Sequence, residues 1–297
     1  MSVPVQDGQS SAVRQGLGAL LRNQMRNIAP FVTLLLLLIF FSVASPSFVT
    51  MDNVANILVQ ISVTGIIAVG LTFVILCGEI DLSVASIANV TGVAVAFFTA
   101  QESYVNIANT SFVMPGAVAI ILALAVCTLL GVINAFGLTK IGIPSFIMTL
   151  AMMQIADGIC ALLLRGQIAY AVPSLVTTIG ANSLGSVPWL VILLALFLIV
   201  GHVVLTYTRF GRYIYMVGGN REAAEYSGDN VKMIVAAVMI ISAVCSGIAG
   251  MLGVAHFGSA QQNELDSYLL DSIAAVVVGG TSLFGGRGGI PNTIVGL

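Results

Sequence analysis

Charged residues are scarce in this chain, since Asp, Glu, Lys and Arg together make up 7% of its 297 residues. Soluble globular domains carry about a quarter charged residues, so this deficit excludes a water-soluble fold. The few basic residues form no patch that could neutralise phosphates, and nucleic acid is not an expected partner. Hydrophobic residues make up 58% of the sequence and recur along its whole length, which predicts an integral membrane protein.

Residues suited to metal or redox chemistry are also few, with four cysteines and two histidines. Each cysteine stands alone in an apolar run and no C-x-x-C pair is present. His202 and His256 have no companions in the sequence that resemble metal ligands. There is no H-E-x-x-H helix, and no Ser/His or carboxylate pair in matched spans. The sequence therefore predicts no metal, no cofactor and no enzymatic activity in this chain.

Apolar runs long enough to cross a bilayer, roughly 20 residues, follow a polar segment of residues 1–27. We expect an all-α, polytopic membrane helix bundle with about eight full spans, forming one transmembrane domain over residues 28–297. A further apolar stretch begins at Ile290 and stops at Leu297. The expected spans are Ile28–Val49, Val54–Cys77, Val84–Ala100, Pro115–Leu138, Pro144–Leu164, Pro188–Tyr207, Val231–His256 and Leu269–Phe284.

The basic residues predict the orientation of these spans. With the N-terminus in the cytoplasm, nine of the ten basic residues fall on the inner side and only Arg165 falls outside. Because Lys and Arg are concentrated in cytoplasmic connections, this orientation is strongly favoured. It also places the connection at about residues 208–230 on the cytoplasmic side.

That connection contains a short polar helix with its own start and stop, Gly218–Gly228. Asn220 can cap it, and Glu222 and Glu225 in the first turn favour the helix dipole. Two alanines leave one side thin enough for a partner to approach, and Gly228 can end the helix. We interpret it as a docking element for a soluble partner, with a plain surface linker as the alternative. The residues assigned to docking are Gly219, Arg221, Glu222, Ala223, Ala224 and Gly228.

Four separate segments carry patterns that can be compared with a known family. Glu222–Gly228 matches the EAA-x3-G pattern of permease subunits in ATP-binding-cassette (ABC) importers. Gly78–Ser86 resembles a GGIDLSVGS signature, and Ala274–Gly288 resembles an AAVVLGGTSLxGGRG block. Asn134–Leu150 is similar to a mid-chain segment of the same proteins. Together the four segments resemble the ribose-type sugar permease family of ABC importers.

The resemblance implies a ten-span permease with the architecture of a type II importer, in the bacterial inner membrane. It implies three protein partners beside the membrane lipids: a cytoplasmic ATPase, a periplasmic sugar-binding protein and a second permease, identical or paralogous. The substrate would be a ribose, other pentose, hexose or polyol, and the docking helix would sit in a cleft of the ATPase. Asp81 is expected to cap, with Ser83, the helix that follows it. The signature turns contribute Gly78, Asp81, Ser83, Gly279, Gly280 and Arg287.

The chain departs from the family pattern in three respects. Glu79 and Ala85 stand where the first signature has glycines, so that turn is expected to be less sharp. Asp157 stands where the family often has a basic residue, which suggests a different substrate preference or pairing. The family continues for two further spans after the position of Leu297, so we expect the C-terminal spans to be missing.

Four polar residues inside the expected spans are candidates for the translocation pathway: Gln60, Asn89, Asn134 and Asp157. Buried amides commonly fasten helices together by hydrogen bonds, which is the alternative for the first three. A charge at Asp157 is costly unless it is paired or hydrated. It either contacts a sugar hydroxyl near the outer gate, or reaches the interface or Arg165.

Two further readings stay open. An ion-coupled secondary transporter of small neutral solutes would have ionisable residues deep in the bundle, and only Asp157 approaches this. A scaffold that binds an ATPase without transport is the other. A requirement for ATP and a binding protein separates the importer from both.

Overall fold

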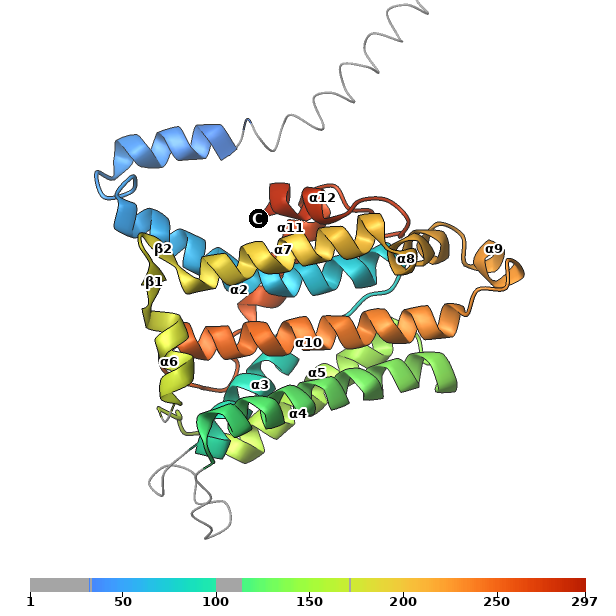
Figure 1. The fold of residues 1–297 in the computed structure, drawn as a ribbon, viewed down its shortest axis with the longest axis horizontal. Coiled ribbons are helices and arrows are strands. Elements are labelled where there is room, and N and C mark those ends of the chain that lie inside the picture. Colours follow the sequence, from blue (N-terminus) through green and yellow to red (C-terminus); the bar gives the residue numbers. More distant parts are fainter. Residues whose placement is uncertain (1–31, 33, 100–113, 171) are drawn as a thin grey trace, which may run out of the picture. The chain divides into compact units, whose positions relative to one another are not determined.

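The structure, a computed structural model, describes residue 32 and residues 34–99, 114–170 and 172–297 (Figure 1). Helices dominate this part of the chain, in agreement with an all-α membrane protein. Two compact units comprise residues 1–54 and 55–297. In the first unit, the described residues Leu34–Ala44 form an apolar helix. The expected first span, Ile28–Val49, lies partly outside the described residues.

Five helices in the described part are long and apolar enough to cross a membrane. They agree within a few residues with five of the expected spans, because long apolar runs are an unambiguous signal. The fourth run continues past its α-helix into a π-helical turn, η1 (Gly137–Ile141). The five helices are α2 (Met51–Leu76), α4 (Gly116–Phe136, with η1), α5 (Ser145–Leu164), α7 (Trp189–Tyr207) and α10 (Val231–Phe257).

One expected span is shorter in the structure than a bilayer requires, since α11 (Ser267–Val278) has 12 residues. At 1.5 Å per residue it measures about 18 Å, less than the roughly 30 Å hydrocarbon core. Helix α3 (Val84–Thr99) agrees within one residue with the expected Val84–Ala100 and ends where the described residues end. The expected span Leu269–Phe284 was too long because the chain turns at Gly280, which has a φ of +107°. The count of eight full spans is therefore not confirmed.

Smaller elements complete the second unit. Helix α6 (Ser174–Ala181) precedes an antiparallel pair, β1 (Ser183–Leu184) and β2 (Val187–Pro188), in which Ser183 lies opposite Pro188. Helices α8 (Arg209–Gly219) and α9 (Arg221–Tyr226) connect α7 to α10, and α12 (Ile290–Gly296) follows α11. Neither α6 nor the strand pair was predicted, because short elements carry little periodic signal.

Helices α2 and α10 form the centre of the second unit. In their most apolar windows 72% and 61% of residues are buried, against 22–28% for α4, α5 and α7. Helices that are apolar on all sides are buried, whereas the other three expose apolar side chains to the surroundings. Helix α10 runs beside α3 and α4 (Figure 1). Helices α2 and α10, the least exposed of the five, therefore lead directly to the site described below.

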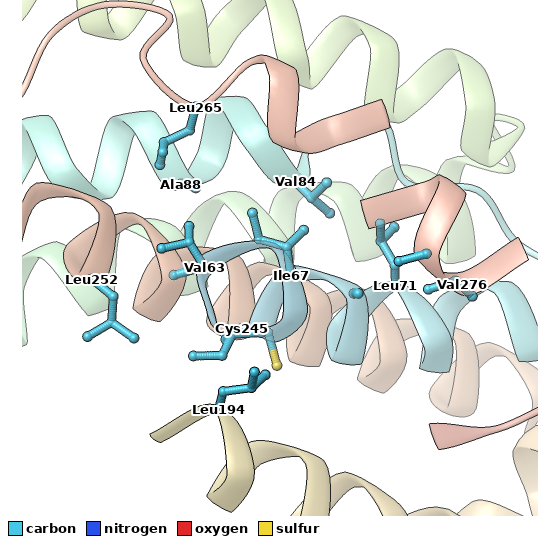
Figure 2. Packing of buried hydrophobic residues seen from close by; sticks show 14 of the residues in the cluster. Val63, Ile67, Leu71, Val84, Ala88, Leu194, Cys245, Leu252, Leu265 and Val276 are labelled. Carbon is cyan, nitrogen blue, oxygen red and sulfur yellow. The ribbon is translucent and has the colours of Figure 1, made fainter. Parts of the chain in front are cut away.

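Close packing holds these helices together. Figure 2 shows Val63, Ile67 and Leu71 of α2 surrounded by side chains of other elements, including Leu194 of α7 and Leu252 of α10. Lipid is as apolar as these side chains, so burial alone drives helix association weakly in a membrane. Dispersion contacts in a tightly packed interior supply the attraction instead.

Candidate functional site: the coupling junction

The predicted docking helix is present as α9, which follows α8 after one residue. The side-chain oxygen of Asn220 accepts a hydrogen bond of 2.9 Å from the amide of Ala223, as predicted for a cap. Gly228 adopts a φ of +87°, the left-handed conformation expected after the helix. The helix has six residues, Arg221–Tyr226. Asn220 and Gly228 therefore set its two ends.

One side of α9 differs from the prediction. Ala224 is buried, 1% exposed, and packs in the same apolar cluster as Val231 of α10. This alanine allows α9 to lie close to its own protein, so its expected role in admitting a partner was wrong. Glu222 and Glu225 are exposed, and Tyr226 is 90% exposed. Sequence reasoning passed over Tyr226, although an aromatic residue on a polar surface helix is a typical binding signal.

Three turns from distant parts of the sequence meet beside α9. The amide of Gly286 donates a 2.9 Å hydrogen bond to the carbonyl oxygen of Leu76, the last residue of α2. A Cβ atom on Gly218 would overlap that same carbonyl. A Cβ atom on Gly285 would lie 2.7 Å from the oxygen of Gly218 and 3.0 Å from the Cα of Gly78. We call the contact of Leu76–Gly78, Gly218–Gly219 and Gly285–Gly286 the coupling junction.

Two side-chain contacts strengthen this junction. Arg221, the first residue of α9, forms an ion pair of 2.7 Å with Glu79 in the first signature turn. The hydroxyl of Tyr215 on α8 donates to the carbonyl oxygen of Gly288 in the second, at 2.9 Å. The Arg221 side chain is 51% exposed, and exposed ion pairs contribute at most about 1 kcal/mol. The ion pair therefore orients α9, while the glycine contacts hold the turns together. The departure at Glu79 thus has a structural role.

The first signature turn is anchored below the junction by Asp81, which is 1% exposed. One carboxylate oxygen accepts from the amide and hydroxyl of Ser83, the residue before α3, at 2.9 and 2.6 Å. Asp81 therefore holds the start of α3, and the cap of the first-turn amides stays a prediction. The other carboxylate oxygen accepts from the hydroxyl of Ser242 on α10, at 2.8 Å. Asn134 on α4 donates to the hydroxyl oxygen of Ser83, at 3.0 Å. A buried carboxylate is tolerated because its oxygens are hydrogen-bonded, and this network joins three helices.

The second signature turn connects α11 to α12. Asn292 donates a hydrogen bond of 3.0 Å to the carbonyl oxygen of Gly279, and Gly280 lies in the left-handed region. The carbonyl of Arg287 accepts a backbone hydrogen bond across the turn, while its side chain is exposed. Phe284 at the tip is 94% exposed. The predicted turn residues therefore shape the loop, and the aromatic tip faces outward.

The pathway candidates divide into two groups. Asn89 donates to Asp266 at 2.8 Å and accepts from the amide of Leu265 at 2.9 Å, so it fastens α3 to the segment before α11. Asn134 belongs to the Asp81 network. Both amides donate hydrogen bonds that join separate elements, while the Oδ1 of Asn134 is buried without a partner among the described residues.

One carboxylate oxygen of Asp157 is also buried without a hydrogen-bond partner in the described part of the chain. Burial, and then the charge of Asp157, raises the pKa of Asp266 above its usual value.

Gln60 has a different environment, since it lines a cavity of about 500 Å³ between α2, α11 and the end of α12. Thr64, Tyr268 and Asp271 line the same cavity and were not predicted. Asp271 is an exposed carboxylate on an otherwise uncharged helix. A charge in such a position is expensive unless water reaches it. The isolated acidic residue was therefore a signal that sequence reasoning could have used.

The chain thus combines a bundle of long apolar helices with a short helix, α9, that lies against two glycine-rich turns. Residues 53–296 match the family described as the permease component of the branched-chain amino acid transport system. The chain belongs to this family. It is a transport permease subunit, and ATP hydrolysis is not its own activity.

Several curated proteins are similar to the chain over most of its length. The ribose import permease protein RbsC of Haemophilus influenzae is 37% identical, covering 90% of this chain and 80% of that protein. RbsC of Bacillus subtilis is also 37% identical, covering 92% and 82%. The D-allose transport system permease protein AlsC of Escherichia coli is 33% identical, covering 90% and 78%. No solved structure matches the chain significantly.

Proposed function

We propose that this chain is the membrane subunit of an ATP-driven importer of ribose, another pentose, a hexose or a polyol. The coupling junction carries this proposal, because it joins an exposed surface helix to the ends of buried helices. The family description mentions branched-chain amino acids, but the relatives at 33–37% identity are named for ribose and allose. The sugar class is therefore the better supported substrate.

The partners follow from the same proposal. A cytoplasmic ATPase binds α9, a periplasmic sugar-binding protein delivers the substrate, and a second permease completes the pore. The N-terminus lies in the cytoplasm and the protein lies in the bacterial inner membrane, as the basic residues favour. With α11 as a helix of partial depth, about eight apolar segments reach into the bilayer.

Mechanically, the junction converts a movement of α9 into a movement of the bundle. Closure of the ATPase displaces α9, and Arg221 and Gly218 transmit the displacement to the turn after α2 and to the turn before α12. At Gly218 the contact is between backbones, so no flexible side chain absorbs the motion there. A rigid element that acts on a packed bundle with two stable arrangements can switch the bundle from one arrangement to the other.

The translocation pathway is proposed to include Gln60 and the cavity that it lines. Hydroxyl, amide and phenol groups of Thr64, Gln60 and Tyr268 suit a neutral substrate rich in hydroxyls. Asp157 remains a candidate near the outer end of α5. The buried Asp81 does not favour an ion-coupled mechanism, because both of its oxygens are engaged by serines that join helices.

Transport by the reconstituted system tests this function. The permease, its ATPase and its binding protein are placed in vesicles, and accumulation of labelled ribose, allose, a polyol and leucine is compared. We expect accumulation of one of the sugars or polyols only when ATP and the binding protein are both present. Uptake driven by a proton or sodium gradient alone, or accumulation of leucine but no sugar, would contradict the proposal.

Docking of the ATPase makes a separate prediction at Tyr226. Replacing it by alanine should weaken binding of the ATPase about tenfold, since exposed aromatic anchors dominate interfaces. Glu222→Lys reverses a charge on the same face and should slow association. Binding is measured by titrating the ATPase onto the purified permease. Tyr170→Ala removes another exposed tyrosine, 63% exposed and outside this connection, and should have no effect. Unchanged affinity in both α9 variants would remove α9 from the interface.

A further inference from the structure

A second cavity, of about 460 Å³, lies beside the coupling junction. It opens between the start of α9, the start of α10 and the connection from α4 to α5, and its charged lining residues are Glu79, Lys140, Arg221 and Lys232. Glu79 and Arg221 neutralise each other at 2.7 Å. Neither lysine has an ion-pair partner within the described part of the chain. The cavity therefore keeps the positive charge of both lysines.

These lysines are the only two in the 297-residue sequence, and both are exposed. They come from separate elements, because Lys140 lies in η1 and Lys232 in the first turn of α10. The π-helical turn ends at Gly142, whose φ is +85°. Single π-helical turns occur frequently at functional sites. The fold thus gathers both lysines around one hollow.

The cavity adjoins apolar surface of α4 and α5. Ile141 lines the cavity and is 64% exposed, and Phe136 one turn earlier is 56% exposed. Near the start of α5, Phe146 and Ile147 are 51% and 56% exposed. On membrane-spanning helices such side chains face acyl chains. A basic hollow at the end of an apolar surface fits an amphiphile with an anionic head.

We propose that this cavity binds the head group of an anionic phospholipid. The phosphate lies between Lys140 and Lys232, and the acyl chains follow the exposed sides of α4 and α5. The inference rests on the proposed orientation, which places the cavity at the cytoplasmic leaflet, where anionic lipid attracts basic residues. Arg221 is both a wall of the cavity and the first residue of α9. A bound lipid therefore restrains the start of the docking helix.

Lipid retention by the purified permease tests the inference. The protein is incubated with phosphatidylglycerol or phosphatidylcholine, and retained lipid is counted by native mass spectrometry. Lys140→Gln and Lys232→Gln should each lower the affinity for phosphatidylglycerol about fivefold, and the double variant should lower it further. Substituting both lysines by arginine should preserve retention. Arg212→Gln removes an exposed charge of α8 that does not line the cavity and should change nothing.

Several results would overturn the inference. One is that the double glutamine variant retains as much phosphatidylglycerol as the parent protein does. Another is that the parent retains as much phosphatidylcholine as phosphatidylglycerol. The last is that inorganic phosphate, at the same concentration as the lipid, displaces it. The last would assign the cavity to a free anion. Because binding is measured on the permease alone, the outcome does not depend on whether the chain transports sugar.

Discussion

Replacing Gly218 by alanine is expected to lower ATP-driven uptake by tenfold to about a hundredfold. The added Cβ would overlap the carbonyl oxygen of Leu76, which already accepts the hydrogen bond from Gly286. Neither backbone can move without separating the turns of the coupling junction. Overpacking costs about 1–3 kcal/mol, and a loss of coupling of this size corresponds to a 5- to 150-fold effect.

Uptake and ATPase activity should be measured together for this variant. We expect the ATPase to bind and hydrolyse ATP while transport is lost, because α9 itself is unchanged. Gly158→Ala is the matched control, since the same substitution on α5 places its Cβ in open space. If Gly218→Ala transports at the parental rate, the junction does not transmit movement and the proposed mechanism fails.

Removing the carboxylate of Asp81 should have the largest effect on stability. In Asp81→Ala, the amide and hydroxyl of Ser83 and the hydroxyl of Ser242 lose their acceptor inside the bundle. Each buried polar group left unpaired costs about 1 kcal/mol or more. We expect a loss of roughly 3 kcal/mol, which lowers the unfolding midpoint by about 6–12 °C in a chain of this size.

Thermal unfolding of the purified permease measures this effect. Asp81→Asn keeps one acceptor oxygen and a group that can bond Ser242, so it should retain most of the stability. Asp229→Ala, which removes a carboxylate from the loop after α9, should leave the midpoint within about 2 °C of the parent. A midpoint for Asp81→Ala equal to the parental value would show that the network does not hold α3, α4 and α10 together.

Features that depend on neighbouring residues could be predicted. The five long apolar helices follow from runs of about 20 residues, and both ends of α9 follow from Asn220 and Gly228. The resemblance also located both signature turns and the docking helix. The length of α11 was not predicted, because hydropathy does not reveal where an apolar chain turns back.

By itself, then, the sequence determined the membrane character of the chain, its long helices, its family and the place of the surface helix α9. Only the tertiary structure decided which residues meet. Arg221 finds Glu79 across 142 positions, and Ser242 finds Asp81 across 161. Such contacts depend on how the helices pack, and packing places Ala224 inward and both lysines around one cavity. A single sequence carries little information on such long-range contacts, because apolar helices can pack against one another in many ways.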